Sequence, residues 1–237
     1  MELTPAVVTL PLRLDPVTVS VLVRDLEIAL ASPAPVVVLR GASAETFCLG
    51  LAIDAADQGT DATREFAALL VTLHRAPKPL LAAVDGAAIG GGFGLVCACD
   101  WVVAAERATF GLPELVWGLL PAMIWPLVAD RMAPHVARQW TLGAYARPAG
   151  DALSAGAVDE MVPAGRLDAA VRRGVRTLAR LEPAALPRLR AWIRDSRRLP
   201  LADAIAEGAA ITSGLMTDAA VHRRWRAFAE GESPWSA

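Results

Sequence analysis

The stretch Lys78-Pro-Leu-Leu-Ala-Ala-Val-Asp-Gly-Ala-Ala-Ile-Gly-Gly-Gly-Phe-Gly94 decides the fold of this 237-residue chain. Its apolar run from Leu80 to Val84 predicts a buried strand, which the turn signal Asp85-Gly86 ends. Three consecutive glycines, Gly90 to Gly92, then open an apolar helix. Glycine lets backbone N–H groups approach a ligand closely, and the start of a helix adds a positive dipole. The sequence therefore predicts a strand–turn–helix unit that stabilises an anionic oxygen.

Apolar runs and amphipathic helix patterns alternate on both sides of this unit. Short buried strands are predicted at Val7–Leu10, Val36–Leu39 and Trp101–Ala105. Helical patterns occupy Val17–Leu30 and Thr63–Leu73. Strands that alternate with helices in this way pair in parallel, so the sequence predicts an α/β fold.

After Pro121 the patterns are helical. Helices are predicted at Trp125–Arg131, Val136–Leu142, Leu167–Leu181, Ala184–Asp195 and Leu201–Thr212. We expect residues 1–180 to form an α/β core and residues 181–237 to form a helical region used for oligomerisation. The reason is that the apolar content of this region exceeds what a small appendage can bury on itself.

Composition and charge exclude several classes of protein. The formal net charge of −2 provides no field that would attract nucleic acid. No apolar run reaches the roughly 18 residues of a membrane span, and the N-terminus lacks a signal-peptide pattern, so we expect a cytoplasmic protein with no membrane partner. Cys48, Cys97 and Cys99 lie in apolar runs and are expected to be reduced core thiols. Without a His/Cys cluster at ligand spacing or a dinucleotide fingerprint, no metal and no cofactor are expected.

A carboxylate follows in the motif Phe110-Gly-Leu-Pro-Glu114. Desolvation in such apolar surroundings raises the pKa of a carboxyl group, which suits acid–base chemistry near neutral pH. The pattern alone leaves other interpretations open: Glu114 caps a helix or pairs with an arginine, and the glycine triplet is a simple turn.

In their order and spacing these motifs resemble the crotonase superfamily, the enoyl-CoA hydratase/isomerases. Cys99-Asp100, Leu142-Gly143 and Ala227-Phe228 extend the resemblance over nearly the whole chain. The resemblance implies a crotonase-like spiral of ββα units with a C-terminal helical trimerisation region. It also implies a homotrimer or a dimer of trimers that acts on an acyl-ACP or acyl-CoA thioester.

The resemblance also implies roles for individual residues. The backbone N–H groups of Leu51 and Gly91 would form the oxyanion hole, and Glu114 would be the catalytic base. Four further positions are substrate-binding candidates: Gly90, Gly92, Asp54 and Trp117. For Asp54, solvation or helix capping remains an alternative, and for Trp117 plain core packing does. Many hydratases of the superfamily carry a second glutamate two residues after the glycine triplet, where this chain has Gly94.

Two departures narrow the resemblance. Bulky residues fill Trp117-Gly-Leu-Leu-Pro-Ala-Met-Ile-Trp-Pro126 where most members have glycines, and the tail from Ala227 lacks the usual basic pair near the coenzyme A phosphates. Together with Phe47-Cys48-Leu-Gly50, this looks like the dehydratases of polyketide β-branching cassettes. The expected function is therefore dehydration of a 3-hydroxy-3-methylglutaryl-type thioester on an acyl carrier protein in polyketide biosynthesis, through an oxyanion-stabilised enolate.

Two other hypotheses stay open. One is hydration, isomerisation or decarboxylation of a CoA ester, for which a single base suffices in isomerisation and none is needed in decarboxylation. The other is a non-enzymatic scaffold that binds an acyl chain or a partner subunit. The presence of Glu114 argues against decarboxylation and against the scaffold.

Overall fold

A computed structural model describes residues 4–52 and 60–230 of the chain. Its contacts divide the chain into two compact units, Met1–Ala179 and Arg180–Ala237. All the residues of the candidate site that the structure describes belong to the first unit.

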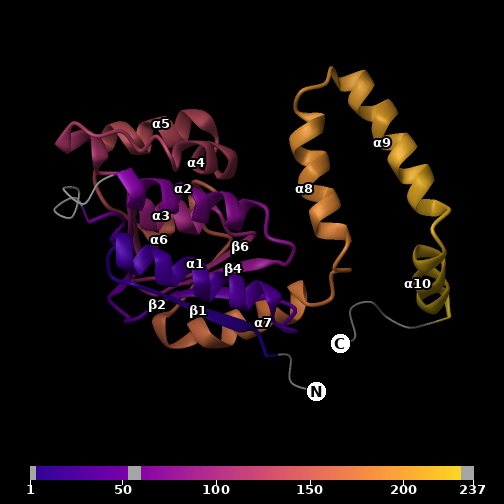
Figure 1. Ribbon diagram of the computed structural model, residues 1–237, viewed down its shortest axis with the longest axis horizontal. Coiled ribbons are helices and arrows are strands. Elements are labelled where there is room, and N and C mark those ends of the chain that lie inside the picture. Colours follow the sequence, from indigo (N-terminus) through magenta and orange to yellow (C-terminus); the bar gives the residue numbers. More distant parts are fainter. Residues whose placement is uncertain (1–3, 53–59, 231–237) are drawn as a thin grey trace. The chain divides into compact units, whose positions relative to one another are not determined.

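A five-stranded parallel sheet forms the centre of the first unit, in the order β1-β2-β4-β6-β9 (Figure 1). Its strands are β1 (Ala6–Leu10), β2 (Val37–Gly41), β4 (Leu80–Val84), β6 (Trp101–Ala105) and β9 (Glu160–Val162). Neighbouring strands of this sheet are separated in sequence by helices, which a parallel pairing requires.

Side chains of the central strands alternate between two apolar layers, as the period of a strand dictates. Val37 and Leu39 of β2 face the layer that holds helices α1 (Pro16–Ala31), α2 (Thr60–His74) and α3 (Gly91–Cys97). Val38 of β2 and Leu81 of β4 face the opposite layer, where α7 (Leu167–Leu178) packs. Figure 1 shows α1 and α7 on opposite sides of the sheet. Because both faces are covered, the strands are apolar on both sides.

A smaller second sheet runs in the order β3-β5-β7-β8. It contains β3 (Thr46–Cys48), β5 (Ala87–Ile89), β7 (Thr109–Gly111) and β8 (Arg147–Pro148), of which only β8 is antiparallel to its neighbour. Each of β3, β5 and β7 directly follows a strand of the first sheet. The units β2-β3-α2 and β4-β5-α3 therefore repeat one ββα design, and the predicted ββα fold is confirmed.

The described part of the first unit also contains the α-helices α4 (Trp125–Arg131), α5 (Pro134–Gly143) and α6 (Ala149–Ser154) and the short 3-10 helices Glu114–Trp117 and Ala164–Arg166. The second unit contains α8 (Ala185–Ser196), α9 (Leu201–Met216) and α10 (Ala219–Ala229), and none of these three helices has a buried residue. The helix predicted to reach residue 181 ends at Leu178. No helix within the described residues has the length and apolar character needed to cross a bilayer.

Candidate active site

Two backbone segments cross at the start of α3, and glycine makes this crossing possible. A Cβ atom on Gly50 would lie 2.7 Å from the Gly91 nitrogen, and one on Gly92 would lie 1.9 Å from the Cys48 carbonyl oxygen. Gly50 also has a φ of 78°, which only glycine adopts at no cost. The crossing therefore holds residues 48–51 directly against residues 91 and 92.

Two backbone N–H groups at this crossing, those of Gly91 and Leu51, are the predicted oxyanion-hole donors. Gly91 is the first residue of α3, so its N–H has no acceptor within the helix. Leu14 donates to the Gly50 carbonyl at 2.8 Å, and Ala52 donates to the Leu14 carbonyl at 2.9 Å. In a parallel bridge of this type the intervening residue, Leu51, turns its own N–H to the other side. Because Gly50, the residue before Leu51, is held against Gly91, the N–H groups of Gly91 and Leu51 both lie at this crossing.

The carboxyl group of Glu114 lies beside this crossing. Glu114 starts a short 3-10 helix (Glu114–Trp117) three residues after the end of β7, and Gly118 ends that helix with a φ of 72°. Its Oε1 atom lies 3.1 Å from the place of a Cβ on Gly90, the residue before Gly91. Its Oε2 atom is buried and has no hydrogen-bond partner among the described residues. Burial raises the pKa of Glu114, so the group is poised to exchange a proton.

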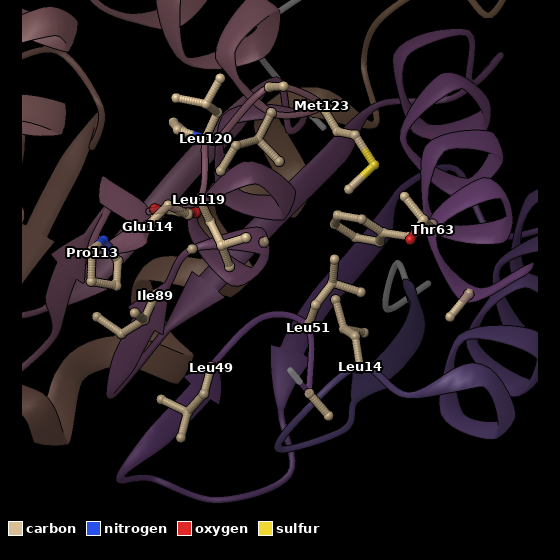
Figure 2. A pocket seen from close by; sticks show the side chains of 18 of the residues that line it. Leu14, Leu49, Leu51, Thr63, Ile89, Pro113, Glu114, Leu119, Leu120 and Met123 are labelled. Carbon is tan, nitrogen blue, oxygen red and sulfur yellow. The ribbon is translucent and has the colours of Figure 1, made fainter. Parts of the chain in front are cut away.

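A cavity of about 550 Å³ opens in front of these groups. Leu14, Leu49 and Leu51 form one side of it, and Leu119, Leu120 and Met123 form another. Figure 2 shows Glu114 beside Pro113 and Leu119, with Thr63 at the opposite side of the cavity. The walls are apolar almost throughout, so the cavity suits an acyl chain whose reacting end meets Glu114.

Positive charge is absent from the described lining of this cavity, which contains no lysine, arginine or histidine. The sequence has none between Arg40 and Arg64, and none from Pro79 to Glu106 or from Ala108 to Asp130. Most of the lining residues fall within these stretches. The charged side chains that line the described cavity are the carboxylates of Asp15 and Glu114.

Asp15 is already engaged in holding the start of α1. Its Oδ1 atom accepts hydrogen bonds from the Thr18 backbone N–H at 2.8 Å and from the Thr18 hydroxyl at 3.0 Å. These hydrogen bonds hold the pKa of Asp15 below its ordinary value. Glu114 is therefore the better base of the two.

Comparison with known proteins identifies the family of the chain. A family model described as enoyl-CoA hydratase/isomerase matches residues 18–236. The chain belongs to the enoyl-CoA hydratase/isomerase family. The predicted crotonase resemblance is confirmed at the level of this superfamily.

Curated proteins and solved structures of this family are similar to the chain. Carnitinyl-CoA dehydratase from Escherichia coli (strain K12) is 29% identical over 174 residues, which cover 71% of this chain and 67% of that protein. An enoyl-CoA hydratase from Shewanella pealeana superimposes with a TM-score of 0.86 at 24% identity, covering 98% of this chain and 93% of that chain. Human enoyl coenzyme A hydratase domain-containing protein 3 gives a TM-score of 0.84 at 20% identity, covering 94% and 90% of the two chains. These two structures support the fold alone.

The other substrate-binding candidates predicted from the sequence do not all line the cavity. Trp117 lines the cavity and is 59% exposed. Gly90 also lines it, whereas Gly92, a substrate-binding candidate, is buried against Cys48 and does not. Asp54 lies outside the described residues. The three cysteines are buried free thiols, as predicted.

One contact between α3 and the residue before α4 was not expected from the sequence motifs. A Cβ on Gly94 would lie 2.2 Å from Cγ2 of Ile124, so the isoleucine fills the space above this glycine. Position 94 therefore cannot be occupied by a glutamate while Ile124 stays in place. The clue in the sequence was the bulky segment after Glu114, but only the structure pairs that segment with Gly94. Among the described residues, no group of three His, Cys, Asp or Glu side chains could hold a metal ion.

Proposed function

We propose that this chain catalyses proton transfer at the α-carbon of an acyl-CoA thioester. The observation that carries the proposal is the Glu114 carboxyl group beside Gly90, one residue from the Gly91 N–H; its Oε2 atom is buried and has no hydrogen-bond partner among the described residues. When the N–H groups of Gly91 and Leu51 bind the carbonyl oxygen of a thioester, a base beside them faces the carbon next to that carbonyl. The family and the CoA ester in the name of the Escherichia coli relative support a CoA ester as substrate.

The proposed mechanism uses two groups of atoms in the chain. The Glu114 carboxylate takes a proton from the carbon next to the thioester carbonyl, and the electron pair of that C–H bond moves into the enolate. The enolate oxygen accepts hydrogen bonds from the N–H groups of Gly91 and Leu51. A donor of this kind contributes roughly 3–4 kcal/mol to transition-state stabilisation in other enzymes. The proton on Glu114 then returns to the substrate.

Dehydration of a 3-hydroxy-3-methylglutaryl group on an acyl carrier protein is the second candidate. The bulky residues Leu119, Leu120 and Met123, which line the cavity, are the observation that favours it. However, a glutaryl group ends in a carboxylate, and a buried carboxylate needs a cation or several donors. The described lining offers no cation and places two carboxylates there instead. This charge distribution favours an uncharged acyl group and makes the CoA ester the first choice.

Deuterium exchange tests the proposal. The purified protein is incubated in D₂O with trans-3-hexenoyl-CoA, an uncharged acyl thioester, and mass spectrometry follows deuterium at C2. We expect exchange by the wild type and none above background by Glu114→Gln. A parallel incubation uses a 3-hydroxy-3-methylglutaryl carrier protein and follows the loss of 18 mass units, the mass of one water. Water loss there without exchange on the CoA ester would replace the first candidate by the second.

A further inference from the structure

Helix α1 is apolar on two opposite faces. One face packs into the main apolar core of the first unit and holds the buried residues Val19, Leu22, Leu26 and Ala29. The other face points to solvent and carries Val17, Val21 and Ile28, whose exposed fractions are 72%, 41% and 61%. A helix at a protein surface normally carries charged and polar side chains on the face away from the core. The outer face of α1 is therefore suited to contact with another apolar surface.

This outer face has the spacing of a helix-packing seam. Four residues define the seam, at intervals of four, three and four positions: Val17, Val21, Arg24 and Ile28. The alternation keeps one stripe of side chains facing a partner helix. Arg24 is the charged residue of the seam, and a polar side chain within such a seam fixes the register, because it has to meet a matching group. The partner that covers the seam is therefore a helix with a carboxylate opposite Arg24.

The chain itself carries a carboxylate in the matching place. The Ser20 hydroxyl donates to Oε2 of Glu65 at 2.7 Å, which holds this carboxylate of α2 at the edge of the seam, one residue from Val21. Arg24 pairs with Asp25 at 3.2 Å, and the Arg24 side chain is 68% exposed. A guanidinium has five N–H donors, so Arg24 can bind a second carboxylate while it keeps Asp25. The seam thus presents a cation at Arg24 and, about one turn earlier, an anion beside Val21.

We propose that α1 is an interaction surface for a second copy of this chain, and that the two α1 helices pack antiparallel across a two-fold axis. In that arrangement Val17 of one copy faces Ile28 of the other, and Val21 faces Arg24. Every contact across a two-fold axis occurs twice with the roles exchanged, so each Arg24 meets the Glu65 of the other copy. A parallel arrangement would set Arg24 against Arg24. The order of charges along the seam therefore selects an antiparallel second copy. The inference concerns the first unit alone and does not rest on the proposed function.

The size of the outer face determines the assay. Three apolar side chains cover on the order of a few hundred Å², less than the roughly 800 Å² per partner of a stable interface. The two-fold contact is therefore expected to exchange rapidly at micromolar concentration. A disulfide formed under mild oxidation traps such a contact, and the three native cysteines do not compete because they are buried.

A pair of introduced cysteines tests the register. In the double variant Val17→Cys/Ile28→Cys, the antiparallel contact brings thiols of different copies together twice per dimer. In either single variant the two introduced thiols would lie about 16 Å apart along the helices, at a rise of about 1.5 Å per residue, whereas a disulfide needs Cα atoms roughly 4–7 Å apart. On a non-reducing gel we expect the double variant to form covalent dimers at least about tenfold faster than either single variant. Equal rates, or no dimer from the double variant, would overturn the inference.

A charge exchange in the double-cysteine background provides the second test. Arg24→Glu and Glu65→Arg each set like charges opposite one another at two places in the dimer. We expect each change to slow cross-linking about fivefold, since two surface ion pairs are lost, and the combination of both changes to restore the rate. Arg138→Glu is the control, because Arg138 is exposed on α5 and makes the same change in charge away from the seam. A combination that stays slow, or an equal loss in Arg138→Glu, would refute the antiparallel seam.

Discussion

Replacing Glu114 by glutamine removes the base and changes the shape of the site very little. The described cavity holds one other carboxylate, Asp15, which its hydrogen bonds to Thr18 keep in place and make a weaker base. A general base contributes roughly 10²–10⁴-fold to a rate. Since the described lining offers no substitute, we expect a loss near the upper end, about 10⁴-fold, which corresponds to about 5 kcal/mol of activation free energy.

The same substitution should leave the fold intact or more stable. Burial raises the pKa of Glu114 in the folded chain, so the ionised carboxyl group destabilises the folded state at neutral pH. Glutamine carries no charge at any pH and removes this cost. We therefore expect the melting temperature of Glu114→Gln at pH 7 to equal or exceed that of the wild type.

The assay combines both readouts. Deuterium exchange at C2 of trans-3-hexenoyl-CoA measures the chemistry, and differential scanning calorimetry measures stability. Glu106→Gln is the matched control, because Glu106 is exposed and does not line the cavity. It should retain wild-type exchange. If Glu114→Gln exchanges as fast as Glu106→Gln, Glu114 is not the base and the proposed mechanism fails.

Three further predictions follow from the same site and from the second unit. Because burial raises the pKa of Glu114, kcat/KM should fall as the pH decreases through a pKa above the ordinary glutamate value, and a pH profile with its acid limb at or below that value would contradict this. Gly92→Ala should lower the melting temperature by roughly 2–12 °C, since its Cβ would lie 1.9 Å from the Cys48 carbonyl and overpacking costs about 1–3 kcal/mol; calorimetry that finds no shift would show that the crossing is not tight. Finally, α9 exposes Leu201, Ile205 and Ile211, so we expect a trimer or dimer of trimers by light scattering, with Ile205→Asp shifting it toward monomer; a wild-type monomer at micromolar concentration would refute oligomerisation.

The large elements of the fold follow from the sequence because their patterns are long and apolar. The strand Leu80–Val84 and the helix starting at Gly91 lie where the pattern predicts them. The short strands β5 and β8 were not predicted, since two or three residues carry too little periodicity to distinguish a strand from a turn. The helices α6 and α10 were not predicted either. Short elements of this kind are set by the neighbours against which they pack.

The candidate site was predictable to the extent that it depends on backbone shape. The triplet Gly90 to Gly92 predicts a close approach of backbone N–H groups to a ligand. The structure adds that Gly50 lies against Gly91 and that Gly92 lies against Cys48, a crossing of two backbone segments that was not predicted. The charge of the cavity was also present in the sequence, as three stretches without a cation, but only the fold shows that these stretches line one space.

The pairing of Gly94 with Ile124 shows why motif positions have to be considered together. Taken separately, Gly94 stands where the family resemblance implies a second glutamate, and Ile124 is a bulky residue in a segment where that resemblance implies glycines. In the structure each explains the other, because Ile124 fits only over a residue without a Cβ, and a longer residue at 94 fits only if Ile124 is smaller. Restoring a carboxylate at position 94 therefore requires a second substitution at Ile124. The contact therefore leaves Glu114 as the carboxylate beside Gly90, and one carboxylate is enough for the proposed proton transfer.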